Sequence, residues 1–227
     1  MNFKSQIFDA VTYTLRDWKG IVLLGIILCI ASTVEEVQVD NMNLYYILLI
    51  ISSITLLFEE GHRYNIIKNT VQEKFSHEVI SDFREFMKEG FIELITAYIF
   101  FLIMYPVYTL SEQTQGITSI ILAIFGYLLY FLFYASAVNK VLHGGRFISG
   151  LNFIEIFKLY YNIGLKRVIF VIILVLINLT LLVHCVLNLG IFRTGHFLDF
   201  IVSFFLNPIL MLTITRFLAI SGKKYYL

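Results

Sequence analysis

Four long, predominantly apolar segments constrain this chain more than any other feature of its sequence. They cover residues 91–110, 117–138, 168–192 and 197–220. A helix that crosses a bilayer needs about 20 mainly apolar residues, because each residue rises about 1.5 Å and the hydrocarbon core is about 30 Å thick. All four segments reach that length, so they predict four membrane-spanning helices.

Two shorter apolar segments, 20–34 and 44–58, precede these four. Trp18 and Tyr46 flank them, as interfacial aromatic residues flank spans, and the second segment becomes long enough to span if it extends to Arg63. With 59% apolar and 15% charged residues, the chain lacks the polar side chains that a soluble surface needs. We therefore predict one all-α membrane domain, 1–227, a polytopic helix bundle. Its six expected spans are about 20–34, 44–63, 91–110, 117–138, 168–192 and 197–220.

The basic residues predict the orientation of the spans. Fifteen Lys and Arg residues lie at the N-terminus, after the second and fourth spans, or at the C-terminus, whereas Arg193 is alone in the opposite loops. Basic residues of short loops favour the cytoplasm. Both termini and both long loops are therefore expected to face the cytoplasm from the cell membrane. The net charge of +1 gives no field that would attract nucleic acid.

Amphipathic segments before three of the spans predict three similar units. Apolar residues recur at helical spacing in 5–19, 78–89 and 152–163, which predicts interfacial helices. Such helices either lie in the headgroup region or pack on the ends of the spans. The glycines that follow them, Gly20, Gly90 and Gly164, are almost evenly spaced along the chain. The bases that close each unit, Arg63, Lys140 and Arg216, are also almost evenly spaced. Each unit is an interfacial helix followed by a helical hairpin, although positive-inside placement alone also puts bases at such ends.

Four stretches of sequence carry a resemblance to a known family. They are "FDAVTYTLRDWKGIVLLGIILCIAS", "GHRYNIIKNTVQEK", "AVNKVLHGGRFISGLNFIEIFKLYYNIGLKRVI" and "LNPILMLTITRFLAI". Together they resemble the archaeal membrane family called domain of unknown function 4013. Residues 76–86 lack the Pro and Trp that the family tends to carry there. The resemblance implies an archaeal cell-membrane protein and transfers no catalytic residue.

Two groups of polar residues near the membrane invite a catalytic or metal-binding interpretation. "EEGHR", "HCVLN" and "FRTGH" resemble pieces of intramembrane CAAX-type proteases, but the first motif is one residue short and the others are in swapped order. The predicted spans also put Glu59 and Glu60 at the opposite face from the histidines, about 25 Å away. A second group lies at one predicted depth near the outer face: His184, Asn188, His196 and Asp199. A cap held by hydrogen bonds is favoured over a metal site there.

The pair Asn207–Pro208 lies midway along the last predicted span, where the proline predicts a bend in the helix.

The sequence has no P-loop, GxSxG, HExxH or Rossmann motif. We therefore expect no enzymatic activity, cofactor, catalytic residue or metal. The predicted function is to bind membrane lipids or a membrane-protein partner, which includes a second copy of the chain. The alternative is a small transporter or permease-like subunit for a small molecule or lipid. That alternative needs polar groups at every depth, and the middle of the spans offers little beyond Asn178, Asn207 and some Ser and Thr.

Charged residues at the cytoplasmic ends of the spans form the candidate site. An ionised side chain at membrane depth is costly unless it pairs, snorkels or meets water. We therefore predict an inner polar cluster in which at least one of the acids contacts a base. Two roles are open: it binds an anionic lipid headgroup or small acid, or it only neutralises buried charge. The candidate residues are Glu59, Glu60, Arg63, Glu93, Lys140 and Arg216.

Overall fold

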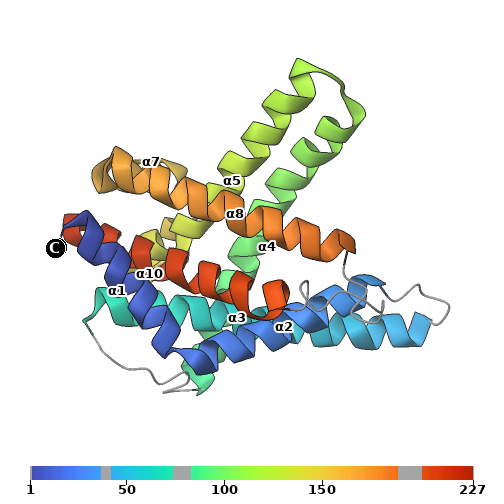
Figure 1. Ribbon diagram of the computed structural model, residues 1–227, viewed down its shortest axis with the longest axis horizontal. Helices are drawn as coiled ribbons and strands as arrows, with labels where there is room; N and C mark the ends of the chain where they lie inside the picture. Colours follow the sequence, from blue (N-terminus) through green and yellow to red (C-terminus); the bar gives the residue numbers. More distant parts are fainter. Residues whose placement is uncertain (1, 37–41, 74–82, 189–200, 227) are drawn as a thin grey trace.

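The computed structural model describes residues 2–36, 42–73, 83–188 and 201–226 (Figure 1). None of these residues forms a β-strand, which confirms the all-helical prediction for the described chain. The elements are α1 (Phe3–Arg16), α2 (Trp18–Glu36), α3 (Met42–Val71), α4 (Phe83–Gln113), α5 (Ile117–Leu142), α6 (Phe147–Gly150), α7 (Phe153–Ile163), α8 (Leu165–Asn188), the π-helix η1 (Val202–Leu206) and α10 (Asn207–Tyr226).

Three helical stretches of the described chain are long and apolar enough to cross a membrane. They are Phe83–Ser111, Ile117–Leu142 and Phe204–Lys224. The bent pair Phe153–Ile163 and Leu165–Leu181 adds a fourth if the two helices count as one span, and Trp18–Cys29 is a shorter apolar helix. The fold is therefore that of a helical protein suited to a membrane, with three or four candidate spans among the described residues.

Helix α10 lies at the centre of the described bundle. It packs against α1, α2, α3, α5, α7 and α8, and every residue from Met211 to Ala219 is buried. Phe217 is fully buried, and its ring centroid lies 4.9 Å from that of Phe170 and 6.1 Å from that of Phe3. At the end of α10, Lys223 Nζ lies 2.6 Å from Glu73 Oε1, just beyond the end of α3. The Lys223 ammonium keeps the pKa of the Glu73 carboxyl below its usual value.

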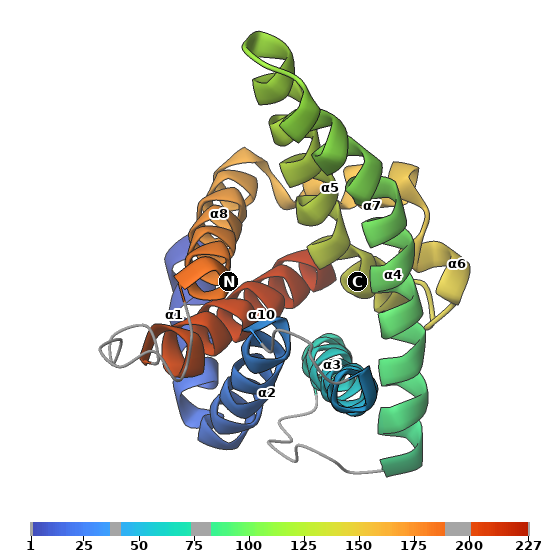
Figure 2. The ribbon, with the colours of Figure 1, turned by 90° about the vertical axis from the view of Figure 1, so that its right-hand side faces the viewer.

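The α4–α5 hairpin extends away from the rest of the bundle. Figures 1 and 2 show its tip well beyond the other helices, which lie together at a large angle to it. Gly116, with a φ of 71°, makes the turn between the two helices. Apolar side chains near the tip remain exposed; Leu102 is 62% and Ile121 is 59% exposed. This surface needs hydrocarbon or a partner around it rather than water.

Two of the three predicted interfacial helices are present as separate helices. α7 coincides with the predicted segment, and it bends by 113° into α8 at Gly164, whose φ of 90° favours glycine. α1 ends at Arg16, three residues before the predicted end, because Asp17 leaves the helical conformation. Both pack on the bundle: Ile156 and Leu159 of α7 are fully buried, as is Ala10 of α1. The buried faces favour packing on the spans over lying in the headgroup region.

The prediction of a separate helix over 78–89 is wrong for the residues that the structure describes. Residues 83–89 form the first turns of α4, which runs through Gly90 without a break. At Gly90, the α4 backbone is so close to α3 that an added Cβ would lie 2.4 Å from the Leu57 carbonyl oxygen. The glycine thus serves helix–helix approach and does not end a helix. Likewise, α3 continues past the predicted end at Arg63, to Val71.

The bend predicted near Asn207–Pro208 takes the form of a change in helix type. The π-helix η1 ends at Leu206, and α10 starts at Asn207. Pro208 has no N–H to donate to the carbonyl of Phe204, four residues earlier, so the regular ladder breaks there. Gly25 of α2 packs against this carbonyl: a Cβ at Gly25 would lie 2.4 Å from the Phe204 oxygen.

Candidate functional site

The candidate site is a cluster of buried charges where α3, α4 and α5 meet. From here on, the inner polar cluster means the set that the structure brings together, which differs from the predicted set by one residue lost, Arg216, and one gained, Glu89. Its six residues are Glu59, Glu60, Arg63, Glu89, Glu93 and Lys140. The α3–α4 contact at Gly90 and Gly61 brings the two helix backbones together, so acidic side chains of both helices share one interior space. The lysine of the cluster comes from α5.

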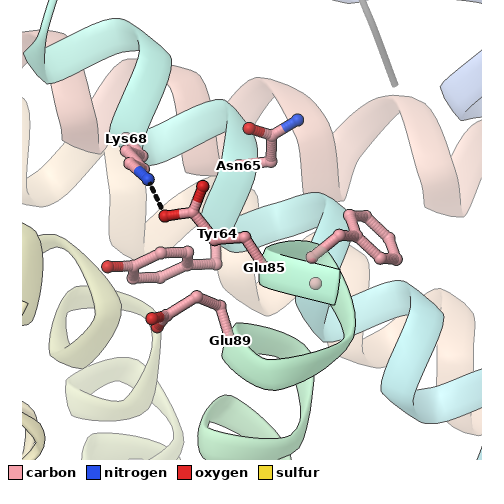
Figure 3. Close-up of a pocket in the computed structure, with 7 residues that line it drawn as sticks. Tyr64, Asn65, Lys68, Glu85 and Glu89 are labelled. Carbon is pink, nitrogen blue, oxygen red and sulfur yellow. Dashed lines mark hydrogen bonds and ion pairs between the residues drawn. The ribbon is translucent and has the colours of Figure 1, made fainter. Parts of the chain in front are cut away.

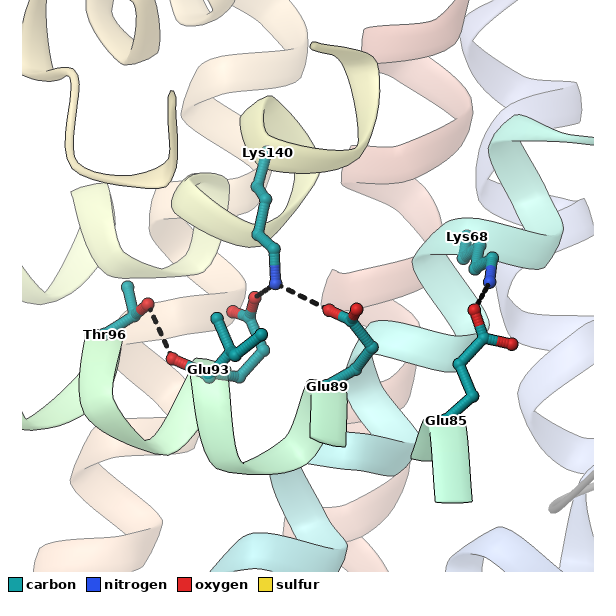
Figure 4. A network of polar contacts seen from close by, with 7 residues as sticks. Lys68, Glu85, Glu89, Glu93, Thr96 and Lys140 are labelled. Carbon is teal, nitrogen blue, oxygen red and sulfur yellow. Dashed lines mark hydrogen bonds and ion pairs between the residues drawn. The ribbon is translucent and has the colours of Figure 1, made fainter. Parts of the chain in front are cut away.

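Lys140 joins two carboxylates of α4. Its Nζ lies 2.8 Å from Glu89 Oε2 and 2.9 Å from Glu93 Oε1 (Figure 4). The ammonium also lies 4.3 Å from the centroid of the Tyr64 ring, which is a cation–π distance. Lys140 is 1% exposed and Glu93 is 0% exposed, so neither charge is compensated by bulk water. The two ion pairs therefore hold the α4–α5 contact together.

Arg63 is the second base of the cluster. Its Nη2 lies 3.0 Å from Glu60 Oε2, one helical turn away on α3. The guanidinium carbon is 4.2 Å from the Phe133 ring centroid and 5.9 Å from that of Tyr134, both on α5. The Tyr134 hydroxyl in turn donates to Asn178 Oδ1 of α8 at 3.0 Å. Polar contacts thus extend from the cluster toward the middle of the bundle.

The structure brings four of the six predicted site residues into acid–base contact and separates one. Glu60 contacts Arg63 and Glu93 contacts Lys140, as the predicted acid–base contact requires. Glu59 is half-buried and interacts electrostatically with Arg63.

Arg216 forms its contacts elsewhere, with α1 and α3, so its predicted place in the cluster is wrong. Its Nη2 lies 3.1 Å from Asp9 Oδ1 of α1, and its Nη1 donates to Thr70 Oγ1 at 2.6 Å. Its guanidinium also lies 4.3 Å from the centroid of the Tyr13 ring. Because α1 packs along α10, Asp9 of α1 reaches Arg216 of α10. Burial of Tyr13 there raises the pKa of its hydroxyl to about 12.

Glu89 was absent from the predicted cluster, yet it contacts Lys140 directly. The prediction of a separate interfacial helix over 78–89 puts Glu89 on the polar face of that helix, away from the cluster. The signal was available in the spacing: Glu85, Glu89 and Glu93 follow one another at intervals of four residues, so a single helix aligns them on one face. Their side chains are 51%, 17% and 1% exposed in that order. Together they form a column of carboxyl groups that enters the bundle from its surface.

A small pocket lies beside Glu85 and Glu89, the two outer members of this column. Figure 3 shows Tyr64, Asn65, Lys68, Glu85 and Glu89 around it, and Lys68 pairs with Glu85 at its rim. Its volume is about 20 Å³. That is enough for about one water molecule, and far too little for a phospholipid headgroup.

The charges of the inner polar cluster favour cations over anions. Four carboxyl groups, Glu59, Glu60, Glu89 and Glu93, accompany two bases, Arg63 and Lys140. With every group ionised, acids outnumber bases, and an anionic headgroup would meet repulsion. The size of the pocket and the excess of acids both disfavour an anionic ligand, so of the two predicted roles they favour the pairing of buried charges.

A buried His–Asp pair is a second polar contact, and its residues were not among the predicted site residues. His62 Nε2 of α3 lies 3.1 Å from Asp17 Oδ2, between α1 and α2, and both side chains are at most 5% exposed. Asp17 Oδ1 also accepts the backbone N–H of Gly20 at 3.1 Å, so it caps the start of α2. The pair therefore links α3 to the α1–α2 junction.

We expect His62→Ala and Asp17→Ala to show a coupling energy of about 1–3 kcal/mol in a double-mutant cycle. Each single substitution leaves the other buried group without its polar partner, whereas the double variant removes both groups. Unfolding of the purified protein in detergent measures it. His143 and Glu155, 3.5 Å apart and 27% and 31% exposed, provide the matched control pair. Their coupling should stay below about 1 kcal/mol. Equal coupling in the two pairs would contradict a special role for the buried one.

An apolar groove lies between α5 and α8, away from the Lys140 contacts. We call it the α5–α8 groove. Its volume is about 210 Å³. It is lined by Ile124, Tyr127, Leu128, Phe131, Ile172, Val175 and Leu176. A cavity of about 150 Å³ with such a lining binds benzene in another protein, so the groove has room for a stretch of hydrocarbon.

The predicted outer polar group is not placed. The side chains of His184 and Asn188, together with His196 and Asp199, lie outside the part of the chain that the structure describes. Within the described part, no group of three or more His, Cys, Asp or Glu side chains is arranged to hold a metal ion.

No protein-family model, curated protein or solved structure matches this chain. The resemblance to domain of unknown function 4013 therefore stays a prediction.

Proposed function

We propose that the protein is a non-enzymatic component of the cell membrane that holds a lipid acyl chain in the α5–α8 groove. The groove is the observation that carries the proposal. Its lining is apolar apart from the Tyr127 hydroxyl, and exposed apolar side chains such as Ile120 and Ile121 of α5 lie near it. In a bilayer such a surface faces lipid tails, which match an apolar groove without requiring a hydrogen bond.

The alternative, a small transporter or permease-like subunit, receives less support from the described residues. The interior that a pathway would cross is occupied by large side chains of α10, of which Leu212, Ile214 and Phe217 are fully buried. The groove itself lies at the periphery, between two helices that both expose apolar surface. Binding of lipid at this surface needs no pathway through the bundle.

The acyl-chain proposal predicts selective lipid crosslinking. The full chain is reconstituted with a phospholipid that carries a photoreactive group on its acyl chain, and crosslinked peptides are mapped by mass spectrometry. We expect enrichment on the groove-facing residues of α5 and α8. Leu176→Trp fills the groove and should reduce this crosslinking several-fold. Ile173→Trp is the matched control, because Ile173 is exposed to a similar degree (49% against 41%) on the same helix but does not line the groove.

Three outcomes separate the possible occupants. Loss of crosslinking in Leu176→Trp with retention in Ile173→Trp supports an acyl chain in the groove. Uniform crosslinking over the exposed α4–α5 surface, unchanged in both variants, would refute it. Protein–protein crosslinks at the groove in place of lipid crosslinks would also refute it and would favour a second copy or another membrane protein as the occupant.

We further propose six spans, with both termini in the cytoplasm of an archaeal cell. Two contacts support placing the termini on one side. Phe3 near the N-terminus contacts Phe217 of α10, and Lys223 near the C-terminus pairs with Glu73, in the loop that is also predicted to be cytoplasmic. In a cysteine-free background, Ser5→Cys and Tyr225→Cys should react with an impermeant maleimide only after the membrane is opened. Modification of either position in intact cells would contradict the orientation.

A further inference from the structure

The column Glu85, Glu89 and Glu93 leads from the surface into a buried, charge-unbalanced site. Exposure falls from 51% at Glu85 to 1% at Glu93 over two turns of α4. The pocket of about 20 Å³ lies between Glu85 and Glu89 and has room for one water molecule. Beyond Glu89, the Nζ atom of Lys140 lies within 2.9 Å of both inner carboxylates.

The inner end of the column has an oxygen atom that no donor satisfies. Glu93 Oε1 faces Lys140, whereas Glu93 Oε2 is buried and accepts no hydrogen bond within the described residues. Lys140 supplies one positive charge for two carboxylates. Glu93 is buried and Glu89 is half-buried, and the two carboxylates share a single ammonium, so one proton added to the pair removes the excess negative charge.

The surroundings of Glu93 do not remove this excess. α3 presents the bases Arg63 and Lys68, the neutral Tyr64 and the acids Glu59 and Glu60. Arg63 pairs with Glu60 and Lys68 pairs with Glu85, so each of these two bases already has an acid of its own. α5 presents Lys140 and the neutral Tyr134. A metal cation in this place would meet both Lys140 and Arg63, whereas a proton is held on the carboxyl group itself.

We propose that Glu85, Glu89 and Glu93 form a proton-entry path that ends at a proton-binding site built from Glu93, Glu89 and Lys140. Chains of carboxyl groups carry protons within membrane proteins. A proton from water binds Glu89 by way of Glu85 and the pocket. Lys140 then gives one N–H proton to Glu93 Oε1 and takes the proton of Glu89 Oε2, so that the ammonium is restored and the net change is one proton on Glu93.

Infrared difference spectroscopy of the full chain in lipid nanodiscs tests the site, with the proton itself as the probe. Lowering the pH should produce the C=O stretching band of a protonated carboxyl group that is shielded from water. The frequency of this band should shift when the sample is transferred to D₂O. Glu93→Gln should remove this band. The variant is expected to fold, because Lys140 then pairs one-to-one with Glu89. Glu89→Gln leaves Lys140 paired one-to-one with Glu93, so it also removes the excess carboxylate and should abolish the band.

Glu85→Gln tests the path, because it leaves the proposed site intact. After a rapid pH step, it should slow the appearance of the band at least several-fold without changing its final size. Glu155→Gln, on α7 outside the column, is the control and should change neither. A band that persists in both Glu93→Gln and Glu89→Gln would overturn the site. A wild-type rate in Glu85→Gln would overturn the entry path.

Discussion

Lys140→Met is expected to lower the free energy of unfolding by about 3–5 kcal/mol, because removal of one member of a buried ion pair leaves its partners uncompensated. Lys140 is the base that contacts both Glu89 and Glu93, and it is 1% exposed. Methionine has a similar length, so the loss of packing is small and the loss of charge is tested. Denaturant unfolding of the purified protein in mixed micelles measures the difference.

Lys158→Met on α7 is the matched control, because this lysine is exposed. It should change stability by no more than about 0.5 kcal/mol. The triple variant Lys140→Met, Glu89→Gln and Glu93→Gln should recover part of the loss, since it also removes the two unpaired carboxylates. A cost for Lys140→Met as small as that for Lys158→Met, or a triple variant no more stable than the single one, would contradict the buried double ion pair.

Gly90→Leu is expected to cost about 3 kcal/mol or more, at the upper end of overpacking substitutions. A Cβ at this position would lie 2.4 Å from the backbone oxygen of Leu57 and 3.2 Å from Gly61 Cα, and backbone atoms cannot turn aside as a flexible side chain does. α3 and α4 would have to separate, which would also spread the acids of the inner polar cluster. Thermal unfolding in detergent measures the loss.

Gly126→Leu in α5 is the control for Gly90→Leu. Both glycines lie within long helices, but a Cβ at Gly126 meets no atom within 4 Å. Leucine is the better helix former by about 0.5–1 kcal/mol, so Gly126→Leu should leave stability unchanged or raise it. Equal destabilisation by the two substitutions would show that glycine flexibility, and not the close approach of α3 to α4, determines the effect.

Local patterns were sufficient to predict the elements that depend on local forces. Helix α7 ends where the predicted segment 152–163 ends, because its apolar residues recur at the helical period and Gly164 terminates it. The long apolar stretches 91–110 and 117–138 lie within α4 and α5, because a chain that crosses hydrocarbon has to satisfy its backbone hydrogen bonds within a helix. The position of the break between α1 and α2, at Asp17 and not at Gly20, and the continuity of α4 through Gly90 could not be predicted this way. A glycine at a helix end and a glycine at a helix crossing look alike in a single sequence.

The candidate site also has features that local sequence predicts and features that depend on helix packing. Residue types and their places at the ends of the apolar segments were enough to predict that the buried acids and bases have partners, since an unpaired charge in an apolar interior is too costly to keep. Which partners they take depends on the packing of the helices. Arg216 meets Asp9, 207 positions earlier in the chain, because α1 packs along α10. Lys140 meets Glu89 as well as Glu93 because α4 is one continuous helix that puts both on the face toward α5. The pairing of charges depends on how helices pack, and packing is set by contacts between residues far apart in the chain.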